Sequence, residues 1–344
     1  MTTSHITLVI PGLFDSLSRQ NQVMPRYNAL EMLLAKSDKS LYEADSYHDY
    51  ILKQYQVELK TAGCVAAVSR FADSAYLDNN LWMQLTPVFL NADKDRLILQ
   101  GQSMLSIKQR EADKLISELN DCYKEDGWRF ESYDPERWYV SIDKHPDSLF
   151  HGYFDALGRN VEHYLPRGKD QTEWHRVVNE IQMLFHASEV NQVRIENSHY
   201  PINSVWCWGI GEIPQSVNSH WHMVYTNDVF CKGLAMLSHN PVFDLPEHAD
   251  VLQKNILSDA GVKQDHEELQ NLVVLQQSEE DCLSLDFSHY TKRISELEEN
   301  WFQPLLNQLK QGLCASITLI ACNGFSYRIE KKHLRRFWRR QKPI

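Results

Sequence analysis

Several features that mark other protein classes are absent from this 344-residue sequence. No apolar run approaches the roughly 20 residues that a helix needs to cross a bilayer, so we expect no membrane span. The seven cysteines are an odd number, and no two have CxxC spacing. This disfavours a disulfide framework or a zinc knuckle and favours reduced thiols. The first residues lack the basic segment of a signal peptide, and we therefore expect a cytoplasmic protein.

The charge is unevenly distributed along the chain. Hydrophobic residues make up 43% and charged residues 24%, as in soluble globular proteins, and the net charge is −11. Residues 331–344 contain seven Lys or Arg and no acid, so residues 1–330 carry −18, the total of −11 less the +7 of this segment. An acidic body makes general nucleic-acid binding unlikely. The basic segment could bind an anionic partner, or it could dock Phe337 and Trp338 on the body, which we favour because such side chains need burial.

Alternating short apolar runs and amphipathic segments predict an α/β fold. The expected strands are 6–10, 86–90, 96–100, 137–142, 204–208, 272–275 and 317–321. The expected helices follow stripes at 107–122, 174–185 and about 290–309. Strands that alternate with helices imply a mostly parallel sheet flanked by helices. Residues 86–165 look like a small α+β domain inserted into a core formed by 1–85 and 166–344.

Polar residues gather where the helix at 174–185 leads into the strand at 204–208. We predict that they form a ligand site: Asn179, His186, Asn191, Arg194, Asn203, Gly209 and Gly211. The guanidinium of Arg194 suits a phosphate or carboxylate, asparagine amides add donors, and glycines let backbone amides approach an anion. These residues could also have structural roles. Arg194 could form an ion pair with a nearby Glu, and His186 could be a hydrogen-bonded structural residue.

The same stretch resembles a known family. His186-Ala-Ser-Glu-Val-Asn191-Gln-Val-Arg194, followed by Asn203-Ser-Val-Trp206-Cys-Trp208-Gly209-Ile-Gly211, is similar to a signature of archaeal-type cofactor-independent phosphoglycerate mutases. The flanking runs also resemble a bacterial group of RpfE-type regulatory proteins: 10–13, 87–90, 179–183 and 336–340. The resemblance implies the fold of the alkaline phosphatase superfamily, whose enzymes hold two divalent metals.

The metal ligands that this resemblance implies are largely missing. The first, an Asp directly after strand one, is replaced by Pro11-Gly12. The remaining candidates are weak: Asp15, Asp286, His289 and Cys322. A soft thiolate does not suit Mg²⁺ or Mn²⁺, and phosphoryl transfer depends almost wholly on metal and positioned charge.

We therefore expect a catalytically degenerate, regulatory relative that needs no cofactor and binds a phosphorylated or carboxylated ligand. The alternative is a phosphoglycerate mutase or related phosphatase that uses Mn²⁺ or Mg²⁺ at a rearranged site.

Overall fold

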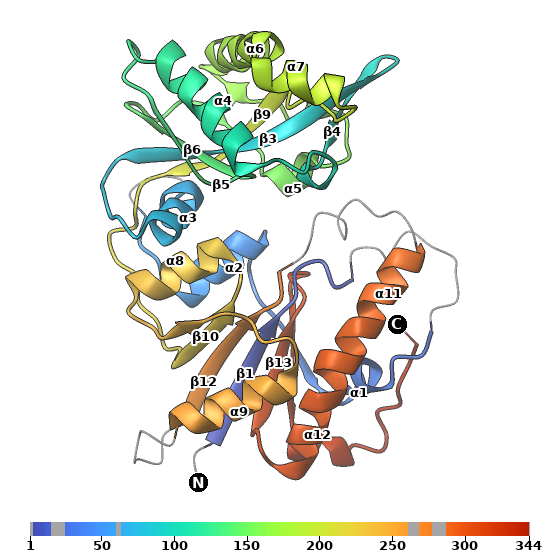
Figure 1. Cartoon of the computed structure of the whole chain (residues 1–344). Helices are drawn as coiled ribbons and strands as arrows, with labels where there is room; N and C mark the ends of the chain where they lie inside the picture. The colour runs from blue at the N-terminus through green and yellow to red at the C-terminus, as the bar shows by residue number, and fades with distance from the viewer. Residues whose placement is uncertain (1–2, 15–24, 60–62, 261–267, 277–286, 344) are drawn as a thin grey trace. The chain divides into compact units, whose positions relative to one another are not determined.

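The computed structural model describes residues 3–14, 25–59, 63–260, 268–276 and 287–343. The chain forms two compact units, each with its own sheet (Figure 1). Unit 1 consists of Met1–Val57 and Val217–Ile344, and unit 2 consists of Glu58–Ser216.

Unit 1 is built on a mostly parallel sheet, as predicted. Within the described residues it has seven strands in the order β11-β10-β12-β1-β13-β14-β2. Their bounds are β1 Thr3–Val9, β2 Asp38–Leu41, β10 Met223–Thr226, β11 Val242–Phe243, β12 Glu268–Val274, β13 Ser316–Ile320 and β14 Phe325–Glu330. The strands β11, β10, β12, β1 and β13 run parallel to one another. Strands β14 and β2 pair antiparallel at one edge of the sheet. Strand β1 is apolar because it lies in the interior of the sheet, between β12 and β13. Its Val9 is paired with Val274 on one neighbouring strand and with Ile320 on the other.

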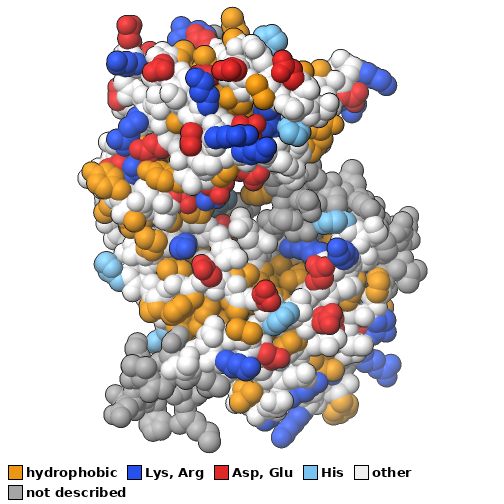
Figure 2. Space-filling view, in the orientation of Figure 1, with side chains coloured by type: hydrophobic (Ala, Val, Ile, Leu, Met, Phe, Trp, Pro, Cys, Tyr) orange, Lys and Arg blue, Asp and Glu red, His pale blue; other side chains and the backbone are white. Residues whose placement is uncertain are grey.

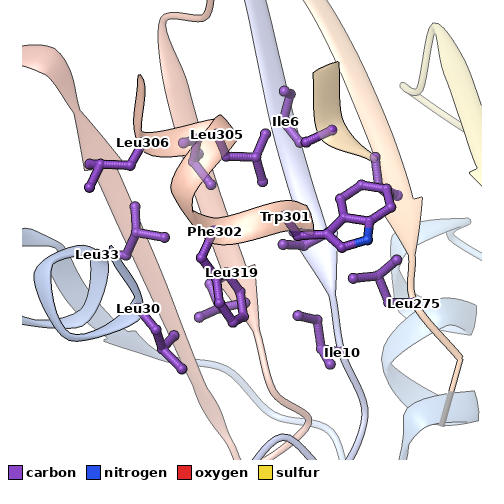
Figure 3. Packing of buried hydrophobic residues seen from close by; sticks show 14 of the residues in the cluster. Ile6, Ile10, Leu30, Leu33, Leu275, Trp301, Phe302, Leu305, Leu306 and Leu319 are labelled. Atoms are coloured by element: carbon purple, nitrogen blue, oxygen red, sulfur yellow. The ribbon is translucent and has the colours of Figure 1, made fainter. Parts of the chain in front are cut away.

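Helices flank this sheet. Their bounds are α1 Asn28–Lys36, α2 Tyr47–Gln54, α8 Val229–Leu237, α9 Ala249–Ala260, α11 Phe287–Leu297, the π-helical turn η4 Glu298–Phe302, α12 Gln303–Gln311 and the 3₁₀-helix η5 Lys331–Arg335. Figure 3 shows Trp301 and Phe302 packed among side chains of β1, β13 and α1. The buried carboxylate of Glu298 accepts hydrogen bonds from the N–H groups of Ala29 (2.6 Å) and Leu30 (3.0 Å). It thereby caps α1, whose own N-cap residue, Tyr27, provides no side-chain bond.

Unit 2 is an α+β unit with an antiparallel sheet. Its longer elements are α3 Val65–Ser74, β3 Leu81–Asp93, β4 Arg96–Gln100, α4 Gln109–Cys122, β5 Arg129–Asp134, β6 Arg137–Ile142, α6 Gln171–Ala187, α7 Glu189–Glu196 and β9 Ser204–Gly211. Shorter elements are η2 Gln102–Met104, β7 Ser148–Leu149, α5 Tyr153–Ala156, η3 Val161–His163 and β8 Arg167–Gly168. Strand β3 pairs with β4, β6 and β9. Apolar side chains of α4 and α6, among them Leu115 and Phe185, cover this sheet.

The inserted unit is larger than the predicted 86–165. The prediction placed the strand at 204–208 in the parallel core, but β9 pairs antiparallel with β3. Helices α6 and α7 join this unit because they lead directly into β9 and share its apolar cluster. The sequence also missed β2, β5, β10 and β14, which are short or carry polar residues on an exposed face.

Acidic and basic side chains are interspersed on the face shown in Figure 2. On this face the acidic side chains are therefore not gathered into one acidic field.

Candidate functional site

Asn191, predicted to bind a ligand, instead joins α6, α7 and the segment before β9. Its side chain is 2% exposed. The Nδ2 atom donates to the carbonyls of Phe185 and Ile202, both at 2.8 Å, and Oδ1 accepts from the N–H of Ile202 at 2.8 Å. Both donors and the acceptor of the amide are thus used within unit 2.

Arg194, predicted as the anion clamp, is buried in the same unit. It is 2% exposed. Nη1 lies 2.9 Å from the Glu111 carboxylate, Nε donates to the Tyr200 carbonyl at 2.9 Å, and Nη2 donates to the Leu105 carbonyl. The anion that this guanidinium binds is the protein's own Glu111. A ligand anion at Arg194 would have to displace this buried ion pair.

The predicted glycines are needed for backbone packing. Gly209 has φ +66°, and a Cβ atom there would lie 3.2 Å from the Cβ of Val65. A Cβ atom at Gly211 would overlap the backbone of Gly63 and Cys64. These contacts with the segment that begins α3 account for both glycines without an anion.

Asn203 and Asn179 lie beside a cavity in unit 2. Asn203 binds the backbone of Leu90 twice: its Oδ1 accepts from the N–H at 2.7 Å and its Nδ2 donates to the carbonyl at 2.9 Å. Leu90 and Asn179 both line the cavity. His186 is exposed further along α6 and is not among the lining residues.

The cavity has a volume of about 270 Å³. Its lining comes from β3, β4, η3, α6, β9 and the segments around Phe150 and Tyr164. The walls are mainly aliphatic and aromatic, with polar atoms from the side chains His151, Tyr164, His175, Asn179, Gln182 and Ser204. Pockets of this character, apolar with a few convergent polar groups, are typical of small-molecule sites.

The polar groups of the cavity are held in place to different degrees. The indole N–H of Trp206 donates to the His151 carbonyl at 3.0 Å, and the Gln182 amide donates to Ser204 Oγ at 3.1 Å. By contrast, the buried Nε2 of His175 has no hydrogen-bond partner among the described residues. Burial raises the pKa of the Cys207 thiol to about 12, so this lining thiol stays protonated and is a poor nucleophile.

The other candidate region is the carboxyl edge of the parallel sheet in unit 1, where ligands bind in open α/β sheets. Asp228 follows β10 there. Its Oδ1 accepts from the Tyr47 hydroxyl and from the N–H of Cys231, both at 2.7 Å. Burial, reinforced by Asp228, raises the pKa of Tyr47 well above its usual value. This carboxylate therefore binds a neutral phenol and caps α8.

A divalent metal centre does not fit the described part of this edge. Pro11 and Gly12 follow β1, and Cys322 follows β13 with φ 55°. Among the described residues, no three His, Cys, Asp or Glu side chains come together as a metal would require. Two of the weak candidates, Asp15 and Asp286, lie outside the described residues. His289 on α11 and Cys322 belong to no such group.

Sequence comparisons identify distant relatives of part of the chain. No known family model matches it. A segment of 61 residues is 34% identical to the 2,3-bisphosphoglycerate-independent phosphoglycerate mutase of Methanosarcina mazei, covering 18% of this chain and 15% of that protein. A segment of 66 residues is 27% identical to the probable enzyme of that name from Geobacter sulfurreducens, covering 19% and 16%. The matches thus span less than a fifth of the curated relatives' length.

Structural comparisons cover nearly the whole chain. The PH0037 protein from Pyrococcus horikoshii aligns over 96% of this chain and 88% of its own, with a TM-score of 0.54 and 10% identity. The cofactor-independent phosphoglycerate mutase from Thermoplasma acidophilum aligns over 95% and 90%, with a TM-score of 0.40 and 13% identity. The first of these shows a shared fold. With the partial sequence matches, the chain is distantly similar to cofactor-independent phosphoglycerate mutases. The resemblance to RpfE-type proteins stays a prediction.

Sequence reasoning missed most of the cavity. It selected Asn179 but not His151, Tyr164, His175 or Trp206. His175 carried a signal, because it lies one helical turn before Asn179 on the same helix.

Proposed function

We propose that this chain is a phosphoglycerate-mutase-like protein that binds a ligand in a regulatory role and does not perform metal-dependent phosphoryl transfer. The observation that carries the proposal is Asp228. This acid lies at the carboxyl edge of the sheet, yet its Oδ1 accepts from the Tyr47 hydroxyl and the N–H of Cys231. In a metal-dependent phosphatase, a carboxylate at such an edge would coordinate the cation.

The donor types near this edge support the same proposal. Pro11 offers no side-chain donor, and the Cys322 sulfur is a soft ligand that does not suit Mg²⁺ or Mn²⁺. Transfer of a phosphoryl group relies on cations that neutralise the developing charge. Asp228 is a hard oxygen ligand at this edge, but the described residues hold no group of three His, Cys, Asp or Glu side chains that could bind such a cation.

Turnover assays test the proposal. The purified full chain would be supplied with Mn²⁺ or Mg²⁺ and assayed for interconversion of 3- and 2-phosphoglycerate and for hydrolysis of p-nitrophenyl phosphate. We expect no rate above that of the buffer with metal. A metal-dependent rate that survives gel filtration would refute the proposal.

A set of variants tests the alternative, a mutase or phosphatase with a rearranged metal site. If turnover is found, Asp15→Ala, Asp286→Ala and His289→Ala should each abolish it, whereas Asp45→Ala, which changes an exposed carboxylate of unit 1, should not. The same variants measured for bound manganese would separate loss of metal from loss of fold.

A second candidate function concerns the basic segment 331–344 and an anionic partner. Arg336 forms two hydrogen bonds to the Asp38 carboxylate, at 2.6 and 3.0 Å, which fixes the segment beside the start of β2. Arg335 and Arg340 are exposed. We expect salt-sensitive binding to heparin that weakens in Arg335→Ser/Arg340→Ser but not in Lys53→Ser. Binding that is equal in all three proteins would dismiss this function.

A further inference from the structure

We infer that the cavity of unit 2 binds an uncharged small molecule with an aromatic or aliphatic body and one hydrogen-bonding group. The inference deepens the ligand-binding role proposed above and gives it a site and a ligand class. It also departs from the phosphorylated or carboxylated ligand that the sequence suggested.

The absence of Lys and Arg from the described lining argues against an anion. None of the described residues that line the cavity is Lys, Arg, Asp or Glu. An anion moved from water into such a site would lose its hydration without gaining the permanent counter-charge of a Lys or Arg, at a cost that few hydrogen bonds could offset. Arg194, the buried arginine predicted as a clamp, is held by Glu111 and is not among the lining residues.

The size of the cavity limits the ligand. An apolar cavity of about 150 Å³ can hold benzene, and drug-sized ligands occupy pockets of roughly 300 Å³ or more. The cavity here, about 270 Å³, falls between these two cases. It therefore suits a molecule with about two fused rings or a branched chain of similar bulk.

His175 supplies the polar contact. Its Nε2 has no hydrogen-bond partner among the described residues and is closed to water-sized molecules, so it would meet a ligand only when the ring turns toward the cavity. A neutral imidazole nitrogen accepts or donates one hydrogen bond according to its tautomer. One hydroxyl, carbonyl or ring N–H on the ligand would satisfy it.

The walls of the cavity are held in place by the protein. Asn203 fixes the backbone of Leu90, and the Trp206 indole is held by the carbonyl of His151. The His151 ring also packs edge-to-face on Tyr164, with ring centroids 5.5 Å apart. A preformed site loses less entropy when the ligand binds, which favours affinity.

A matched pair of probes tests the ligand class. 2-Naphthol is neutral with one hydroxyl, whereas 2-naphthyl phosphate has the same rings and a double negative charge. Calorimetry with the full chain should show that 2-naphthol binds at least about tenfold more tightly, a difference of about 1.4 kcal/mol. In ¹H–¹³C NMR spectra, 2-naphthol should shift the ring Cε1–H signals of His151 and His175 but not that of exposed His186.

Variants locate the binding. His175→Phe should weaken 2-naphthol by about fivefold to tenfold through loss of one hydrogen bond, while His186→Phe, on the same helix, should not. Leu97→Trp and Asn179→Trp add bulk at lining positions that are already exposed, Leu97 by 37%, so both should fold yet lose most of the binding.

Two results would overturn the inference. One is affinity for 2-naphthyl phosphate that equals or exceeds that for 2-naphthol. The other is unchanged 2-naphthol affinity in both tryptophan variants. Neither depends on turnover, so an active phosphotransferase would refute the proposed function and leave this measurement standing.

Discussion

The side chain of Asn203 holds the backbone of Leu90 at both its N–H and its carbonyl, at 2.7 and 2.9 Å. The two residues are 113 positions apart in the chain. This contact joins the start of β9 to the end of β3, where the strand pairing with β9 stops at Val88. It also fixes one wall of the cavity, since Leu90 is a lining residue.

Asn203→Ala should therefore destabilise unit 2. Two partly buried backbone groups lose their partners, and we expect the free energy of unfolding to fall by about 1–3 kcal/mol. Urea unfolding followed by circular dichroism measures the change. Asn197→Ala is the control, because that exposed amide makes one local bond and should matter little. Equal stabilities for wild type and Asn203→Ala would show that the contact contributes no net stability to unit 2.

Removal of the Arg194 side chain should lower the free energy of unfolding and leave anion binding unchanged. Arg194→Ala leaves Glu111 and the carbonyls of Leu105 and Tyr200 without their donor. Breaking such a buried pair costs about 3–5 kcal/mol. Arg176→Ala removes an exposed pairing with Glu180 at 3.7 Å and should cost less than about 1 kcal/mol. If Arg194→Ala unfolds like the wild type but loses affinity for phosphate, the anion-clamp interpretation returns.

Loss of the Tyr47 hydroxyl should weaken the carboxyl edge of the sheet. In Tyr47→Phe, Asp228 Oδ1 keeps the N–H of Cys231 and loses the phenol. We expect about 1–2 kcal/mol of destabilisation, since a hydrogen bond to a charged group contributes more than a neutral one. Tyr76→Phe, at an exposed tyrosine of unit 2, provides the control for the chemical change. A stability loss of the same size in both variants would contradict this account.

Tyr42 should make the chain sensitive to alkaline pH. Burial raises the pKa of Tyr42 from 10.0 to about 12 in the folded protein. The unfolded chain then releases this proton first, so the stabilisation is complete below pH 10 and is lost as the pH rises towards 12. Tyr42→Phe should show a smaller loss of unfolding free energy across this range than the wild type. Urea titrations at several pH values between these limits measure it, and identical slopes would reject the assignment.

Local patterns predicted those parts of the fold that are set by neighbouring residues. The strand Arg137–Ile142 and the stripe of α6 are clear in the sequence, because β-branched alternation and helical periodicity act over a few residues. The placement of β9 could not be predicted in this way. An apolar strand fits a parallel core or an antiparallel insert equally well, and only its pairing with β3 decides.

The candidate site shows the same limit. Arg194 and Glu111 are 83 positions apart, and nothing near either residue indicates that they meet. Isolated from its partner, a guanidinium among asparagines looks like an anion site; with the partner present, it is part of the core. His151 and His175 likewise line the same cavity only because α6 packs on the sheet, which the local sequence does not indicate.

The exposed aromatic pair near the C-terminus gives the last prediction. The sequence favoured docking of Phe337 and Trp338 on the body, yet they are 85% and 65% exposed and pack edge-to-face on each other, with ring centroids 5.1 Å apart. The segment is held instead by its polar groups: Lys36 Nζ donates to the Arg339 carbonyl at 2.7 Å, and Arg336 binds Asp38. The docking prediction is therefore wrong for the two aromatic rings.

Phe337→Ser/Trp338→Ser should consequently change the free energy of unfolding by no more than about 0.5 kcal/mol, as for other surface substitutions. Trp301→Ser, at a buried ring of the unit 1 core, is the matched control and should cost about 3–5 kcal/mol. Chemical denaturation of the three proteins compares them directly. A loss above about 2 kcal/mol in the double variant would mean that the rings are buried in solution. A small loss would show that the two rings stay on the surface of the folded protein and that polar contacts such as Arg336–Asp38 hold the segment.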